Sequence, residues 1–358
     1  MKVAVVALTK QGIQKGAEVE KALIKRGHQV MFFVPGKYSL LKLPGRRSPF
    51  RKPLRDLMAE LMHEYEAIVC IMALGIVVRL IAPYLQDKRT DPAVVVLDEK
   101  GCNVISVLSG HWGGANGLTS ELAREMGANP VITTATDVQG LPAIEMMAKE
   151  KGWAVGDFSL VKKVNAAIVN CAPVHLYCDE EINTSLPKNV VQFPVYQFKP
   201  TEDAGALRVV VTNRFLPGNS EDTLFLRPKN LVLGIGCRKG VSKAALRDAV
   251  IDALAKANVV FESVRAIASV DLKAKEPALL ELAGEWNIPV QFYSPGELQK
   301  VFSGKESGKL SRSEFVKEKL GVDGVCEPAA LLETGNQGKL ILPKTSGKGV
   351  TVAIAEDI

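Results

Sequence analysis

The sequence predicts an α/β protein whose N-terminal and C-terminal α/β domains, with mostly parallel sheets, are joined by a small α+β middle domain. An apolar β-type run at residues 2–8, a helical stretch at 13–26 and a second β-type run at 28–34 open the chain. Such alternation is typical of a parallel sheet covered by helices. It begins afresh at Asn230, which indicates a second α/β unit.

The middle of the chain interrupts this pattern. From about Gly156, short β-type runs are separated by proline and polar turns. A chain of 358 residues is also too long to fold around one ordinary hydrophobic core. We therefore expect an N-terminal α/β domain at 1–152, a middle linker domain at 153–229 and a C-terminal α/β domain at 230–358.

Composition and charge narrow the class of protein. No apolar run approaches the roughly 18 residues that a bilayer span needs, and the N-terminus enters a strand directly, so we expect a cytoplasmic protein without membrane contact. The net charge of +6 favours an anionic partner. The six cysteines lie far apart without a Cys-x-x-Cys pair, which indicates reduced thiols and no protein-bound metal.

A basic stretch at residues 35–55 carries seven cations, four prolines and no acidic residue. We expect a long, mobile loop, which is either a solvated linker or a lid whose Arg46, Arg47 and Arg51 bind substrate carboxylates in forked pairs. Nucleic acid is not an expected partner, because only two aromatic side chains in this stretch could stack on bases.

Three loops follow predicted strands of the N-terminal domain, and ligands collect at the carboxyl ends of strands in open α/β sheets. The first leads from Ala73 to Gly75 and into a helix that carries Arg79 on an otherwise apolar surface, where Arg79 either reaches water or points toward an anion. The second is Ser109–Gly117, which is delivered by a hairpin. The third begins at Thr133 and precedes a helix that carries Glu145.

The Ser109–Gly117 loop combines four glycines with a hydroxyl, an imidazole, an indole and an amide. Glycine permits positive φ angles and close backbone approach, and free N–H groups at a helix start attract carboxylate or phosphate. We therefore expect a functional loop instead of a tight turn with a structural histidine.

The C-terminal domain offers two further candidates. A strand at 231–233 leads into a turn at 234–240, which misses the dinucleotide fingerprint by one residue but leaves an anion-binding helix start beside Arg238. Glu327 stands at a second helix start, as either a capping glutamate or an acid/base group. A hairpin from 340 to 355 closes the chain.

The order of these blocks resembles the cobalt-precorrin-5A hydrolase family of anaerobic cobalamin (vitamin B12) biosynthesis. The resemblance covers nearly the whole chain, and 156–230 matches loosely. Its most specific pieces lie at 73–79, 109–116, 134–137, 233–238 and 327–330.

This resemblance implies an enzyme that opens the δ-lactone of a cobalt-bearing tetrapyrrole and releases the C20 carbon as acetaldehyde, breaking a carbon–carbon bond. The cobalt arrives in the substrate, so no cofactor is expected, and the partners are the tetrapyrrole and other enzymes of the pathway. The substrate-binding residues that we predict are Gly75, Arg79, Ser109, Gly110, Trp112, Gly113, Gly114, Asn116, Thr134, Asp137, Gly234, Gly236 and Arg238.

Hydrolysis requires a base for water and donors for the developing oxyanion. We expect His111, with an unperturbed pKa of about 6.5, to be the base, the amides of Gly113 and Gly114 to be the donors, and Glu145 or Glu327 to be the second acid/base group. The alternative is a non-catalytic tetrapyrrole-binding or handover module in which His111 ligates cobalt. A nucleotide-dependent transferase is disfavoured by the missing fingerprints.

Overall fold

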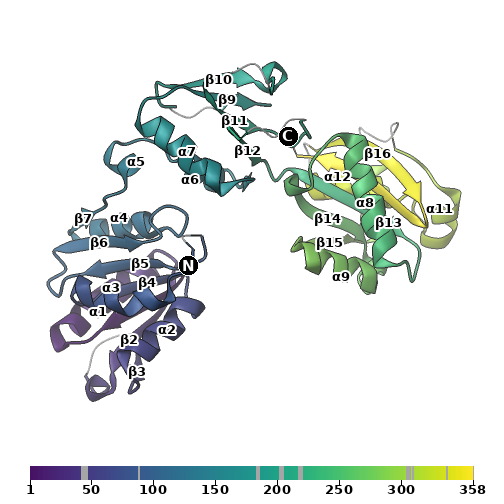
Figure 1. The fold of residues 1–358 in the computed structure, drawn as a ribbon. Coiled ribbons are helices and arrows are strands. Elements are labelled where there is room, and N and C mark those ends of the chain that lie inside the picture. Colours follow the sequence, from purple (N-terminus) through teal and green to yellow (C-terminus); the bar gives the residue numbers. More distant parts are fainter. Residues whose placement is uncertain are drawn as a thin grey trace. The chain divides into compact units, whose positions relative to one another are not determined.

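The computed structural model describes residues 1–41, 47–87, 89–182, 186–200, 205–216, 221–303, 308, 310–335 and 338–357 (Figure 1). The chain forms two compact units, Met1–Met147 and Ala148–Ile358. The first contains one sheet and the second contains two, and helices accompany each sheet. The predicted α/β class is therefore confirmed.

The first unit is built on a seven-stranded sheet in the order β3-β2-β1-β4-β5-β6-β7. The strands are β1 (Lys2–Ala7), β2 (Gln29–Pro35), β3 (Arg47–Phe50), β4 (Ala67–Ile71), β5 (Ala93–Leu97), β6 (Asn103–Leu108) and β7 (Asn129–Val131). The helices are α1 (Lys10–Lys25), η1 (Gly36–Tyr38), α2 (Leu54–Glu64), α3 (Leu74–Ile81), η2 (Ala82–Tyr84), α4 (Ala115–Met126), α5 (Ala135–Val138) and α6 (Ile144–Glu150), of which α6 crosses the boundary between the units.

Alternate side chains of β1 explain why this sheet has helices on both faces. Val3 and Val5 pack with apolar side chains of α1 and α4, whereas Ala4 and Val6 pack with those of α2 and α3. Successive side chains of a strand point to opposite faces, so a strand buried on both faces reads as one continuous apolar run.

The direction of the strands divides the predicted loops between two edges of the sheet. β1 to β5 are parallel, but β6 runs antiparallel to β5, and β7 is parallel to β6. The loop after β6 therefore lies where β5 begins, and Ser109 Oγ donates to the carbonyl oxygen of Asp91 at 3.0 Å. The loop after β4, with Gly75, lies at the opposite edge. The three loops therefore do not lie at the same end of the strands, because the predicted hairpin between β5 and β6 reverses the direction of the chain.

The basic stretch is not a continuous loop. Arg47–Phe50 forms the edge strand β3, where the missing N–H of Pro49 is tolerated. Arg47 Nη1 donates to the carbonyl oxygen of Leu41 at 2.6 Å, while Arg51 is exposed. Arg46 lies outside the described residues.

The second unit begins with a sheet in the order β10-β9-β11-β12-β8, which is parallel except for β8. Its elements are β8 (Ala154–Val155), α7 (Phe158–Val169), β9 (Val174–Cys178), β10 (Val190–Pro194), η3 (Val195–Gln197), β11 (Leu207–Val211) and β12 (Thr223–Arg227).

The second sheet of this unit has the order β15-β14-β13-β17-β16, with helices on both faces. Its elements are β13 (Leu231–Cys237), α8 (Lys243–Ala257), η4 (Phe261–Ser263), β14 (Val264–Val270), η5 (Asp271–Lys273), α9 (Pro277–Trp286), β15 (Val290–Tyr293), α10 (Pro295–Val301), α11 (Glu314–Leu320), α12 (Cys326–Thr334), β16 (Lys339–Gly347) and β17 (Val350–Glu356). β16 and β17 form the predicted closing hairpin.

Candidate functional site

A cluster of one imidazole and two carboxylates forms in the first unit, beyond the ends of β6 and β7. His111 Nδ1 lies 3.0 Å from Glu145 Oε1, and His111 Nε2 lies 2.8 Å from Asp137 Oδ2. Thr136 Oγ1 lies 3.0 Å from the same Nε2. The three side chains of this acid–base cluster, His111, Asp137 and Glu145, were all singled out from the sequence. Thr136 was not, although it belongs to the same hydroxyl-rich block.

The glycines of the loop are required by its shape. Gly114 has a φ of +92°, and a Cβ on Gly113 would lie 2.4 Å from the Cβ of Ser109. A Cβ on Gly110 would lie 2.7 Å from Oδ1 of Asn116. These close approaches fold the loop tightly enough to place His111 beside Asp137.

The predicted pair of oxyanion donors is reduced to one. The Gly114 amide donates to the carbonyl oxygen of His111 at 3.0 Å, so it is not free for a ligand. Within the described part of the chain, the Gly113 amide donates no hydrogen bond. Gly113 therefore keeps the predicted role and Gly114 loses it.

Asn116 supports the cluster from inside and is too buried for the predicted contact with substrate, whereas Thr134 is half-buried and its predicted contact with substrate stays a prediction. Asn116 is 6% exposed; its Nδ2 donates to Thr134 Oγ1 and Asp137 Oδ2, each at 2.9 Å, and its Oδ1 accepts from Ser106 Oγ at 2.7 Å. Three of the four hydrogen bonds that this amide can form are thus made, because a buried polar group without partners would be costly. Ser106 was not identified from the sequence, since a single serine in a strand carries no recognisable pattern.

The two carboxylates shift the acid–base equilibrium of His111. The hydrogen bond that His111 donates to Glu145 raises the pKa of His111; burial opposes this effect, and the hydrogen bond to Asp137 adds to the rise. The expectation of an unperturbed imidazole is therefore wrong. An ionised carboxylate only accepts hydrogen bonds, so an imidazole between two of them is best satisfied as the doubly protonated cation.

Gly75 and Arg79 are not brought together with this cluster. Both residues are exposed and lie on α3, which follows β4. Because β4 and β6 run in opposite directions, the loop after β4 lies at the other end of the strands from the cluster. The same helix also exposes Leu74, Ile76 and Val78. The exposure of Arg79 is compatible with both alternatives, so its role stays a prediction.

A basic cavity of about 890 Å³ lies within the second unit, beside the ends of β13 and β16. It is lined by six cations and one carboxylate, which is that of Glu327. The cations are Arg238, Lys239, Lys273, Lys319, Lys344 and Lys348. Lys273 pairs with Glu276 and Lys348 with Asp248, but the other four form no ion pair with another described residue. This basic cavity suits a polyanionic ligand, and Gly236 and Arg238 line it as predicted.

Gly234 and Glu327 have structural roles instead of the predicted functional ones. β13 extends through Cys237, so the first four residues of the predicted turn at 234–240 belong to the strand, and Gly234 is buried beneath α12. Glu327 is 1% exposed and accepts from the amides of Ser311 at 2.6 Å and Lys344 at 2.8 Å and from Ser311 Oγ at 3.1 Å. Its carboxylate therefore ties α12 to two other segments.

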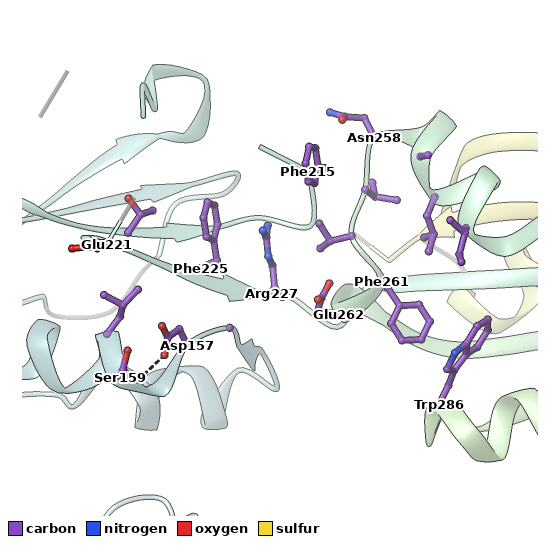
Figure 2. Close-up of a pocket in the computed structure, with 18 of the residues that line it drawn as sticks. Asp157, Ser159, Phe215, Glu221, Phe225, Arg227, Asn258, Phe261, Glu262 and Trp286 are labelled. Atoms are coloured by element: carbon purple, nitrogen blue, oxygen red, sulfur yellow. Dashed lines mark hydrogen bonds between the residues drawn. The ribbon is translucent and has the colours of Figure 1, made fainter. Parts of the chain in front are cut away.

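A larger cavity of about 1130 Å³ in the second unit has a different character (Figure 2). Its lining contains three acidic and three basic side chains, and none of the predicted site residues. Arg227 lies over the ring of Phe225 at 4.3 Å and donates to the carbonyl oxygens of Thr212 and Arg214 at 2.9 Å. Balanced charge of this kind gives no preference for a polyanion.

The described residues contain neither a cluster of metal-ligating side chains nor a membrane-spanning helix. No group of three or more His, Cys, Asp or Glu side chains there could hold a metal ion. None of the described helices is long and apolar enough to cross a membrane.

Three sequence families match successive parts of the chain: cobalamin synthesis G N-terminal at 56–137, cobalamin biosynthesis central region at 142–228 and cobalamin synthesis G C-terminus at 231–355. The chain is 35% identical to a cobalt-precorrin-5A hydrolase of Priestia megaterium over 98% of its own length and 94% of that protein. It is also 35% identical to a cobalt-precorrin-5A hydrolase of Salmonella typhimurium over 86% of each chain. A solved structure of a putative cobalamin biosynthesis protein G homolog from Sulfolobus solfataricus is 23% identical, covers 100% of this chain and 97% of its own, and has a TM-score of 0.39.

Proposed function

The chain belongs to the cobalt-precorrin-5A hydrolase family, and we propose that it opens the δ-lactone of cobalt-precorrin-5A and releases the C20 fragment as acetaldehyde, giving cobalt-precorrin-5B. Two relatives that bear the hydrolase name match most of its length. The observation that carries the proposal is the acid–base cluster of His111, Asp137 and Glu145.

Lactone hydrolysis needs one group that removes a proton from water and one that returns a proton to the leaving alkoxide. The cluster offers an imidazole and two carboxylates, each of which lies within 3.0 Å of a ring nitrogen. The unengaged amide of Gly113 supports the proposal further, because backbone N–H groups stabilise a developing oxyanion.

The alternative of a handover module with His111 bound to cobalt gains no support from this geometry. Both ring nitrogens already lie within 3.0 Å of carboxylate oxygens. Coordination of a metal requires a nitrogen lone pair, so His111 would have to give up one of these hydrogen bonds and its proton.

We assign the basic cavity of the second unit to the acetate and propionate side chains of the substrate. Guanidinium and ammonium groups bind carboxylates through charge-assisted hydrogen bonds. Arg238, Lys239, Lys319 and Lys344 are the cations of this cavity that form no ion pair with another described residue. The acid–base cluster and the basic cavity lie in different units, and each is tested by itself.

Incubation of the purified protein with the cobalt-containing lactone tests the activity. We expect the lactone to be consumed with release of one equivalent of acetaldehyde. His111→Ala should lose acetaldehyde release, whereas His63→Ala, which alters an exposed histidine of α2, should keep it. Tight binding of the macrocycle by the wild-type protein without acetaldehyde would favour the handover module.

A further inference from the structure

We propose that the carboxylate of Asp137, and not the imidazole of His111, is the base that takes the proton from the attacking water. His111 then acts as a positioning residue that holds this carboxylate in place. The inference rests on the proposed lactone hydrolysis and assigns the roles within the acid–base cluster.

The imidazole of His111 lies between two carboxylates. Nδ1 faces a carboxylate oxygen of Glu145 at 3.0 Å, and Nε2 faces one of Asp137 at 2.8 Å. Ionised carboxylates only accept, so both nitrogens must donate. His111 consequently has no lone pair with which to remove a proton from water.

The two carboxylate oxygens of Asp137 have different surroundings. Its Oδ2 accepts from His111 Nε2 and from Asn116 Nδ2 at 2.9 Å. Its Oδ1 makes no hydrogen bond with any described residue. Two donors thus fix one oxygen and leave the other open to a water molecule.

The three side chains of the cluster differ in their exposure to solvent. The side chain of Glu145 is 6% exposed, that of His111 is 17% exposed and that of Asp137 is 36% exposed. A general base must lie within hydrogen-bond distance of the water that it activates. Of these three groups, Asp137 is the one that solvent and substrate reach most readily.

Glu145 has a separate part in this arrangement. One imidazolium cation lies between two carboxylates, so the cluster carries a net charge of −1. A buried cation without a second anion would hold the Asp137 carboxylate in a neutral pair. The buried carboxylate of Glu145, which accepts from His111 Nδ1, supplies this second anion beside the imidazolium.

The reaction step balances as follows. Asp137 Oδ1 takes one proton from water as the water oxygen bonds to the lactone carbonyl carbon, whose π electrons move onto the carbonyl oxygen. The carbonyl re-forms, the bond from the acyl carbon to the ring oxygen breaks, and the leaving oxygen takes the proton from Asp137. One water is consumed, a hydroxy acid forms, and the Asp137 carboxylate is regenerated.

The pH dependence of lactone opening by the wild-type protein separates the two candidate bases without any substitution. If Asp137 is the base, the rate persists below the pKa of His111 and falls as His111 loses its proton. If His111 is the base, the rate instead rises through that pKa. NMR titration of the four histidines, with His111 assigned by its absence in His111→Gln, gives the pKa independently of activity.

Variants provide a second test. Asp137→Asn should reduce the rate of lactone opening by roughly 10²-fold or more, the usual scale for loss of a general base. Asp252→Asn, at an exposed position on α8, should leave the rate unchanged. Circular dichroism of both variants is the control that tests whether each is folded.

The outcomes are distinct for this inference and for the proposed function. A wild-type protein that opens no lactone contradicts the proposed function. An active wild-type protein whose rate rises through the pKa of His111, or a folded Asp137→Asn that opens the lactone at the wild-type rate, overturns the assignment of Asp137 alone.

Discussion

Replacing Gly234 by alanine tests whether this glycine serves packing or substrate. A Cβ at this position would lie 1.8 Å from the carbonyl oxygen of Cys326, and such contacts stay above 3.0 Å in real proteins, so α12 must move by at least 1.2 Å. The obstructing atom belongs to the backbone at the start of α12, where Ala329 and Ala330 are fully buried. Overpacking costs about 1–3 kcal/mol, and a backbone obstacle favours the upper end.

Thermal melting followed by circular dichroism measures this cost. For a unit of about 200 residues, 1 kcal/mol shifts the melting temperature by about 2–4 °C, so Gly234→Ala should lower it by about 6–12 °C. Gly284→Ala is the matched control, because its Cβ would meet nothing within 4 Å on the exposed side of α9. It should raise the free energy of unfolding by about 1 kcal/mol. An unchanged melting temperature for Gly234→Ala would refute the packing argument, and lost turnover without lost stability would return Gly234 to substrate binding.

Three further predictions follow from the charged groups. Lys319→Gln should raise the substrate dissociation constant by about 1.4- to 5-fold, as measured by titration, whereas Lys162→Gln, on the exposed side of α7, should not. Because the folded-state pKa of His111 is raised, its contribution to stability is fully present below about pH 6.5 and is lost as the pH rises through the folded-state value. Urea unfolding across this range should show that loss in the wild-type protein and not in His111→Gln. Glu327→Gln should cost about 1–3 kcal/mol of unfolding free energy while the folded fraction keeps its turnover; lost turnover at full stability would restore the predicted acid/base role.

The fold class could be predicted because each strand and each helix has a periodicity that is visible in its own short stretch of sequence. β1, α1 and β2 could be recognised from their periodicity, and the turn at Asp98 correctly indicated a hairpin. The error lay in applying the carboxyl-end rule without following strand direction. That hairpin places the loop at Ser109 and the loop at Gly75 on opposite edges of one sheet.

Gly234 shows why some glycines mislead. A strand followed by Gly-x-Gly resembles a phosphate-binding turn, and nothing nearby in the sequence argues otherwise. The reason for the glycine is the backbone of Cys326, which is 92 residues further along the chain and packs against the strand. A contact of this kind leaves no local pattern, so periodicity and motif spacing could not have revealed it.

Sequence separation also explains why one candidate site could be predicted more readily than the other. The acid–base cluster comes from one continuous stretch, His111 to Glu145, in which a short parallel strand returns the chain to the edge that it has just left. Each of its members stands near a loop that composition alone makes conspicuous. The basic cavity instead draws its cations from segments near Arg238, Lys273, Lys319 and Lys344, and each lysine in isolation is indistinguishable from a solvated surface residue. β17 pairs with β13 on one side and with β16 on the other, and thereby brings the segment at Arg238 near the segment that carries Lys344. Charge that is dispersed along the sequence therefore gathers around one cavity only through the topology of the sheet.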